Sequence, residues 1–201
     1  LLNNEINDYI VTTGVGNHQM MAAQYIKWKQ PNKYISSGSL GVMGVGLPFA
    51  IGSQIANPDK MVIDIDGDGS FNHTLAELKT IQNYNLPIKI AVMNDTNLGM
   101  VRAWENLFFK EKYAATDLIK NPSYTNLAES FGIKSIYCDS EDDLENKIDQ
   151  FIKTEGSVLA EFKVIPDLCL PLVSPGKSLD DMILLNDNLK MSNFDTELPP
   201  G

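Results

Sequence analysis

The stretch Ile63-Asp64-Ile65-Asp66-Gly67-Asp68-Gly69-Ser70 decides the fold, together with Ile90-Ala91-Val92-Met93-Asn94-Asp95-Thr96-Asn97 further along the chain. The apolar run 61–65 predicts a buried parallel strand, and 71–83 carries apolar residues at helical spacing. Strand, helix and strand make a βαβ unit. Its right-handed crossover places the ends of both strands at the same edge of the sheet.

Two acidic side chains follow these strands, Asp68 after the first and Asp95 after the second. Mg²⁺ prefers oxygen ligands and is commonly shared between one or two protein groups and a substrate phosphate. We therefore expect Asp68, Asp95 and the backbone carbonyl of Asn97 to hold one magnesium ion. Gly67 and Gly69 would let the backbone approach the phosphate. Taken alone, the Gly-Asp-Gly segment favours a simple turn after a strand, and it is the spacing to Asn94-Asp95 that favours a metal site.

The rest of the chain repeats this alternation and predicts an α/β fold, a parallel sheet of about six strands with helices on both faces. We expect strands at 9–13, 33–36, 61–65, 88–93, 134–137 and 158–164, and helices at 18–28, 46–56, 71–83, 98–109, 123–131 and 141–154. At 201 residues and 43% apolar content, the chain can bury a full core.

Two further segments are rich in glycine. Residues 13–16 form a turn before a helical pattern, where backbone N–H groups suit an anion, although a plain connecting loop has the same composition. Residues 38–48 contain four glycines, too many for the interior of an ordinary helix or strand. Backbone is expected to approach a ligand closely there. On a helical interpretation, Met43 would be an ordinary core residue.

Composition excludes several classes of function. The net charge of −10, from 16 basic and 26 acidic residues, argues against nucleic acid or an anionic membrane as partner. The acidic run 139–149 is typical of a solvated helix start. No apolar run is long enough for a membrane span, so we expect a soluble protein. Cys138 and Cys169 are expected to be free thiols, and His73 to lie at a surface or interface.

Three motifs flank the acidic pair: Thr12-Thr13-Gly14-Val15-Gly16-Asn17-His18-Gln19-Met20, the segment 36–48 (SSGSLGVMGVGLP) and the segment 98–105 (LGMVRAWE). With Gly67-Asp68-Gly69 and Asn94-Asp95 at their spacing, they resemble the catalytic subunit of the acetohydroxyacid synthases (acetolactate synthases), which use thiamine diphosphate. The resemblance is colinear from about residue 10 to residue 180. Two positions depart from it: Asp95 replaces the usual metal-binding asparagine, and Asn17 replaces a glutamine.

The resemblance implies a set of site residues. Gly16, Asn17 and His18 would contact the diphosphate, Gly41 would offer its carbonyl to the aminopyrimidine, and Met43 would hold the cofactor bent. Trp104 would shape the pocket of the second substrate; a core tryptophan is the alternative. The full set of implied cofactor-binding residues is Val15, Gly16, Asn17, His18, Gly41, Met43, Gly67, Asp68, Gly69, Ser70, Asp95, Asn97, Gly99, Met100 and Val101, with Asp68, Asp95 and Asn97 also holding the metal.

The resemblance also implies an activity. These enzymes condense pyruvate with pyruvate or 2-oxobutyrate, releasing carbon dioxide, in branched-chain amino acid biosynthesis. Their activating glutamate lies on a pyrimidine-binding domain and their FAD on a middle domain, so this chain is expected to contain no catalytic residue and to be inactive alone. Expected partners are those two domains of the same polypeptide, a second subunit in a homodimer or larger assembly, and a regulatory subunit. A different thiamine-diphosphate-dependent 2-oxo acid decarboxylase or oxidase, or a non-catalytic homologue suggested by Asp95, are the alternatives.

The expected organisation is the end of an interdomain linker at 1–8, a domain binding thiamine diphosphate and Mg²⁺ at 9–170, and a C-terminal tail or lid at 171–201. Residues 97–116 and 170–201 are expected to be mobile without cofactor, because the tail is rich in proline and lacks apolar periodicity. The expected location is the cytoplasm, or an organelle in a eukaryote.

Overall fold

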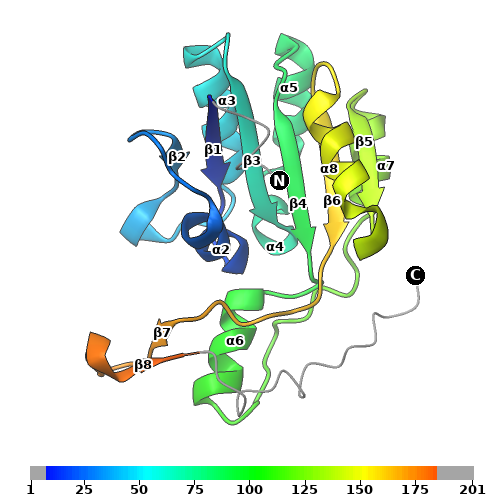
Figure 1. Ribbon diagram of the computed structural model, residues 1–201. Coiled ribbons are helices and arrows are strands. Elements are labelled where there is room, and N and C mark those ends of the chain that lie inside the picture. The colour runs from blue at the N-terminus through cyan, green and yellow to red at the C-terminus, as the bar shows by residue number, and fades with distance from the viewer. Residues whose placement is uncertain (1–7, 185–201) are drawn as a thin grey trace.

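The computed structural model describes residues 8–184, so most of the predicted linker 1–8 and the end of the predicted tail, 185–201, lie outside the described residues. Six parallel strands form one twisted sheet in the order β2-β1-β3-β4-β6-β5 (Figure 1). The strands are β1 (Tyr9–Thr13), β2 (Tyr34–Ile35), β3 (Met61–Gly67), β4 (Lys89–Asn94), β5 (Lys134–Cys138) and β6 (Val158–Lys163). The predicted α/β class and the six-stranded parallel sheet are confirmed.

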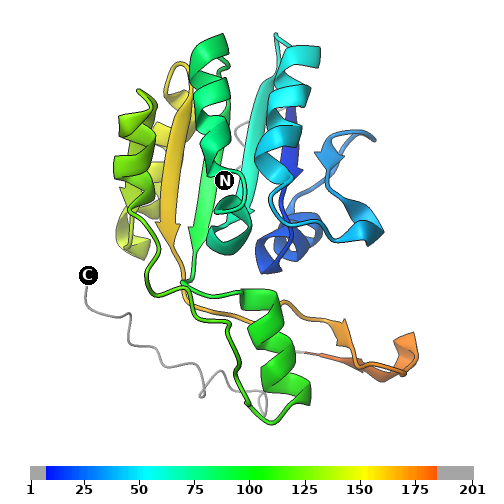
Figure 2. The ribbon, with the colours of Figure 1, turned by 180° about the vertical axis from the view of Figure 1, so that it is seen from behind.

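Helices cover both faces of the sheet, as predicted. On one face, α3 (Gly46–Ala56), α5 (Leu78–Tyr84) and α7 (Tyr124–Ser130) pack through Leu47, Ile81 and Tyr124 onto strand residues such as Ile90 (Figure 2). On the other face, α2 (Asn17–Tyr25) and α8 (Leu144–Lys153) form a second apolar core. These two layers bury the four central strands, β1, β3, β4 and β6, which is why those strands are apolar on both sides.

The register of the central strands places the predicted metal residues side by side. Gly67 pairs with Met93 at the carboxyl ends of β3 and β4. Asp68 therefore begins the short helix α4 (Asp68–Phe71) directly beside the loop that carries Asp95. Strand β3 runs two residues further than the sequence pattern indicates, because Asp66 and Gly67 stay paired with β4.

One predicted helix is wrong. The segment 71–83 is not continuous: α4 ends at Phe71, a 3-10 turn spans Leu75–Glu77, and α5 begins at Leu78. Thr74 leaves the helical region with φ −134°, and its hydroxyl donates to the carbonyl of Gly44 at 2.8 Å. A tertiary hydrogen bond thus interrupts a stretch whose apolar spacing is helical.

The helix predicted at 18–28 also ends early, at Tyr25. Ile26 is extended, and Trp28 folds back so that its ring lies 4.9 Å from that of Tyr34 and its Nε1 donates to the carbonyl of Ala23. The remaining helices keep their predicted places, with a 3-10 turn at Glu141–Asp143 before α8.

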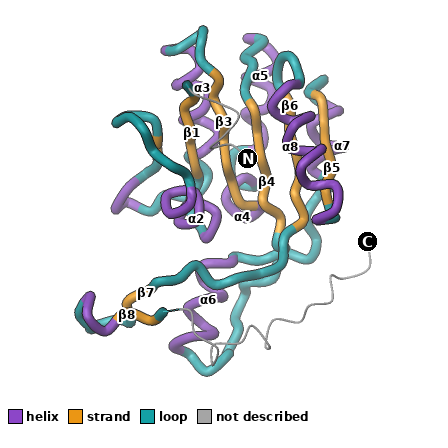
Figure 3. The backbone as a smooth tube through the Cα atoms, in the orientation of Figure 1, coloured by secondary structure: helices purple, strands orange, loops and turns teal. Residues whose placement is uncertain are grey.

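Two elements lie beyond the carboxyl edge of the sheet, apart from the layers (Figure 3). One is α6 (Gly99–Phe108), and the other is an antiparallel pair, β7 (Leu172–Val173) with β8 (Met182–Ile183), joined through a 3-10 turn at Leu179–Asp181. The sequence does not predict this pair of strands. Within residues 8–184, none of the helices is both long and apolar enough to cross a membrane.

Candidate cofactor and metal site

A cavity of about 320 Å³ opens at the carboxyl edge of the sheet, between the ends of β1, β3, β4 and β6 and the start of α6. All the predicted cofactor-binding residues except Gly41 line it. It is also lined by residues that the sequence analysis does not identify: Met21, Met93, Leu98, Val164, Ile165 and Asp167. Open α/β sheets bind their ligands at this edge, so the cavity is the candidate cofactor site.

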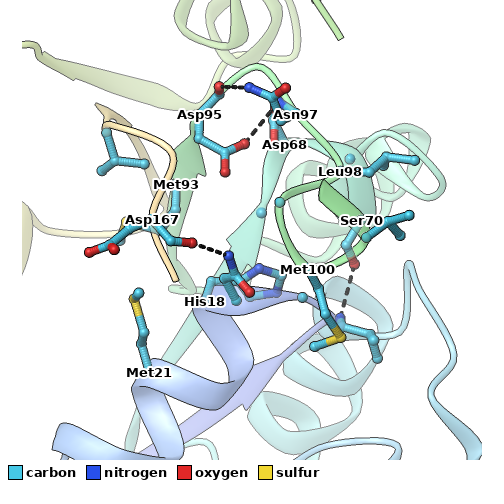
Figure 4. A pocket seen from close by; sticks show the side chains of 18 of the residues that line it. His18, Met21, Asp68, Ser70, Met93, Asp95, Asn97, Leu98, Met100 and Asp167 are labelled. Carbon is cyan, nitrogen blue, oxygen red and sulfur yellow. Dashed lines mark hydrogen bonds between the residues drawn. The ribbon is translucent and has the colours of Figure 1, made fainter. Parts of the chain in front are cut away.

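Asp68, Asp95 and Asn97 lie together at one end of the cavity (Figure 4). Oδ1 of Asp95 accepts the backbone N–H of Asn97 at 2.9 Å, and Nδ2 of Asn97 donates to the carbonyl of Asp95 at 2.6 Å. The amide oxygen of Asn97 is buried without a hydrogen-bond partner. Two carboxylates and an unpartnered buried oxygen are a donor set that fits a hard cation such as Mg²⁺. The described residues contain no group of three or more acidic, histidine or cysteine side chains that could hold a metal ion by itself, so an oxygen of Asn97 would complete this donor set.

Burial sets the electrostatics of this pair. It raises the pKa of Asp68 to about 7, and the neighbouring charge of Asp95 adds to the rise. Burial likewise raises the pKa of Asp95 to about 6. The backbone hydrogen bond from Asn97 and the charges of His18 and Arg102 lower this pKa and so limit the rise. Two buried carboxylates that resist ionisation gain most from a divalent cation between them, because the cation offsets both charges.

His18, one residue after α2 begins, lies between two glycines. A Cβ on Gly67 would lie 2.6 Å from Nδ1 of His18, and a Cβ on Gly16 would lie 2.8 Å from Cε1. Nε2 of His18 lies 3.3 Å from the fully buried carboxylate of Asp66. The glycines are therefore needed for the imidazole to fit at the cavity wall, a role distinct from the close approach of phosphate.

Ser70 joins the two glycine-rich segments. Its Oγ accepts the backbone N–H of Gly44 at 2.9 Å. It also accepts that of Val15 at 3.4 Å (Figure 4). Met43 enters the cavity from the second segment. The loops that the sequence analysis assigns to the cofactor are thus held together under the cavity by one hydroxyl.

Gly41 and Trp104 do not reach the cavity. Gly41 ends a 3-10 turn (Gly38–Leu40) in the left-handed conformation, φ 58°, and is exposed. Trp104 is 36% exposed on α6, where its ring contacts the edge of Phe108 at 5.2 Å between centroids. Their assigned roles stay predictions. As predicted, His73 is exposed, and Cys138 and Cys169 are free thiols.

Comparison with known proteins identifies the family. Residues 14–162 match the thiamine pyrophosphate enzyme C-terminal TPP-binding domain, thiamine pyrophosphate being another name for thiamine diphosphate. The chain belongs to this family. The α/β fold and the predicted thiamine diphosphate site at the carboxyl edge agree with that membership.

Several relatives are acetolactate synthases. The chain is 44% identical over 190 residues to the mitochondrial acetolactate synthase catalytic subunit of Saccharomyces cerevisiae. This alignment covers 94% of the chain and 26% of the yeast protein. The chain is 42% identical over 177 residues to the acetolactate synthase isozyme 2 large subunit of Escherichia coli, covering 88% of the chain and 32% of the relative. It is also 42% identical over 188 residues to the chloroplastic acetolactate synthase 2 of Nicotiana tabacum, covering 89% and 28%. The predicted resemblance is confirmed, and the chain spans a quarter to a third of these relatives.

Proposed function

We propose that this chain is the thiamine-diphosphate-binding part of an acetolactate synthase, which condenses two 2-oxo acids with loss of carbon dioxide in branched-chain amino acid biosynthesis. The observation that carries the proposal is the cavity itself, which gathers the acidic pair, the loop 15–18 and the start of α6 at one edge of the sheet. Relatives that share this sequence over most of its length bear the name acetolactate synthase.

The residues present fit the cofactor and its metal. Asp68, Asp95 and an oxygen of Asn97 would hold Mg²⁺ against the diphosphate, and the backbone of 15–17 with His18 would bind the remaining phosphate oxygens. Asp95 adds a negative charge relative to asparagine, but it is a competent magnesium ligand, and the cation compensates that charge. When bound, thiamine diphosphate supplies the nucleophilic carbon that adds to a 2-oxo acid and accepts the negative charge left by decarboxylation.

The chain's own residues would orient this chemistry. Met43, Leu98 and Met100 are apolar groups on the cavity wall, and apolar walls exclude water from a carbon that must not be protonated early. In the enzymes that this chain resembles, the activating glutamate lies on a pyrimidine-binding domain. We therefore propose that the glutamate comes from such a domain outside this chain, and that FAD, where present, binds a middle domain.

Other parts of the proposal concern assembly and location. Exposed apolar side chains include Val101 at 49%, which lines the cavity, Phe109 at 58%, at the end of α6, and Leu40 at 81%. They support contact with a further domain and with a second subunit, as a homodimer or larger assembly. A regulatory subunit is a further proposed partner, because the Escherichia coli relative is named a large subunit. The mitochondrial and chloroplastic names of eukaryotic relatives support an organelle in a eukaryotic source and the cytoplasm otherwise.

Two measurements test this function. Calorimetric titration of the chain with thiamine diphosphate should show binding that depends on Mg²⁺. The polypeptide that contains this chain should form acetolactate from pyruvate, while the 201 residues alone should form none above a buffer control. Release of acetaldehyde or acetate without acetolactate would favour a decarboxylase or oxidase, and Mg²⁺-dependent binding without turnover in the longer polypeptide would favour a non-catalytic homologue.

A further inference from the structure

A ring of hydrogen bonds starts and ends on Asp68. Asn121 Nδ2 donates to Asp68 Oδ2 at 2.6 Å, and Asn72 Nδ2 donates to Asn121 Oδ1 at 3.0 Å. The hydroxyl of Tyr124 lies 2.9 Å from Asn72 Oδ1, to which it donates, and 3.4 Å from the carbonyl of Asp68. Donation runs in one direction, from tyrosine through both amides to the carboxylate, so each bond polarises the next.

The three residues that join Asp68 in this ring of hydrogen bonds lie behind the cavity wall. Tyr124 is fully buried, and its ring meets the edge of Phe71 at 5.7 Å between centroids. Asp68 lines the cavity, whereas Asn72, Asn121 and Tyr124 do not. These three residues therefore act on a bound ligand only through Asp68.

The segment that supplies Asn121 also holds the other half of the candidate metal site. Leu98 N–H donates to the carbonyl of Thr116 at 2.8 Å, and Leu118 N–H donates to the carbonyl of Thr96 at 2.7 Å. These bonds pair the loop of Asp95 with residues 116–118. The segment 116–121 thus bonds to the loop that carries Asp95 and, through Asn121, to the carboxylate of Asp68.

We propose that Asn121 is a positioning residue for metal binding, which fixes the carboxylate of Asp68 in one orientation at the cavity wall as the end of the Tyr124–Asn72–Asn121 ring. The inference rests on the proposed function, since it assumes that Asp68 binds Mg²⁺. Residues that orient metal ligands typically change metal affinity by about 10–100-fold when replaced.

The test is the Mg²⁺ concentration that half-saturates thiamine diphosphate binding, measured by calorimetry on the 201-residue chain. Asn121→Ala should raise this concentration by about 10–100-fold, while saturating Mg²⁺ restores cofactor affinity to the wild-type value. Asn126→Ala, on the exposed side of α7, is the matched control and should match the wild type. General structural damage would lower cofactor affinity in a way that excess Mg²⁺ does not restore, and that result would overturn the proposal.

Tyr124→Phe keeps the packed ring and removes only the hydroxyl. It should shift the Mg²⁺ requirement in the same direction by a smaller factor. Combined with Asn121→Ala it should add nothing, because the ring is already open. An unshifted Asn121→Ala variant, or fully additive shifts, would overturn the ring as a unit. A wild-type chain whose cofactor binding ignores Mg²⁺ would instead overturn the proposed function.

Discussion

Asn17 Nδ2 donates to the backbone carbonyl of Asp167 at 2.7 Å and so joins the first residue of α2 to the segment that leaves β6. Seven residues later on the same helix, Gln24 Nε2 donates to the carbonyl of Leu170 at 2.9 Å, and the thiol of Cys169 lies 3.4 Å from Gln24 Oε1. Val164, Ile165 and Asp167 form a cavity wall. Helix α2 therefore carries the proposed diphosphate contacts and also holds the cavity wall formed by these three residues.

Gln24 lies outside the cavity and offers a test of this wall. Gln24→Ala should weaken the attachment of 167–170 by about 1 kcal/mol, the usual net value of a hydrogen bond, and so increase amide exchange there by about fivefold. Gln150→Ala on the exposed side of α8 is the control. Unchanged exchange at 167–170 in hydrogen-exchange mass spectrometry would show that the wall is held by other contacts. The same measurement tests the predicted mobility of 97–116 and 170–201.

The acidic pair should govern metal-dependent binding. Asp68→Ala should abolish the Mg²⁺ dependence of thiamine diphosphate binding, because one of two carboxylate ligands is lost. Asp95→Asn should leave binding within a few-fold of the wild type, since an amide oxygen also suits the metal. Equal cofactor affinity with and without Mg²⁺ in both wild type and Asp68→Ala would remove this metal assignment.

The raised pKa values predict an unusual pH dependence of stability. The folded-state pKa is about 7 for Asp68 and about 6 for Asp95, both above the usual carboxylate value, and burial raises the pKa of Asp64 in the same direction. The folded chain therefore binds more protons than the unfolded chain over about pH 4 to 7. The stabilisation of the folded state by these groups is therefore complete below about pH 4 and is lost as the pH rises through about 7.

The melting temperature of the metal-free chain should therefore fall as the pH rises from about 4 to about 7. Asp95→Asn should make this fall smaller. Mg²⁺ needs ionised ligands, so the stabilisation by Mg²⁺ with thiamine diphosphate should grow over the same pH range. If Asp95→Asn leaves the dependence of the melting temperature on pH unchanged in the metal-free chain, the raised pKa of Asp95 is contradicted.

The glycine contact with His18 predicts a steric effect at Gly67. Gly67 has φ −90°, which alanine adopts without strain, but its Cβ would lie 2.6 Å from the imidazole. Gly67→Ala should therefore cost about 1–3 kcal/mol of unfolding free energy. Gly52→Ala in α3, where a Cβ would meet nothing within 4 Å, should be neutral or stabilising. Adding His18→Ala to Gly67→Ala should recover much of the loss, and a double variant no more stable than the single one would refute the contact.

Local sequence pattern and parallel topology are enough to predict the sheet and the acidic pair. Asp68 and Asp95 each come after an apolar strand, so the sheet alone brings them together. Ile165 and Asp167 line the cavity from the loop after β6, and Asn121 contacts Asp68 from the loop before α7. These loops have no apolar periodicity, so only the tertiary structure shows the contacts. The break in the helix between Phe71 and Leu78 is also missed, because the spacing of apolar residues cannot predict the tertiary hydrogen bond from Thr74 to Gly44.

Trp104 supplies the last prediction, which concerns substrate choice. It lies on α6, one turn beyond Met100 and Val101, which line the cavity, and it is partly exposed instead of buried in the core. In the multidomain enzyme proposed above, Trp104→Leu should shift the preference between pyruvate and 2-oxobutyrate as second substrate, because the resemblance assigns this residue to the pocket of the second substrate. The melting temperature should change little, since the side chain is not part of either core cluster. Phe109→Leu, at the end of the same helix and 58% exposed, is the control and should keep the wild-type product ratio. An unaltered ratio of acetolactate to acetohydroxybutyrate in competition assays, or an unfolded Trp104→Leu protein, would assign this tryptophan to structure alone.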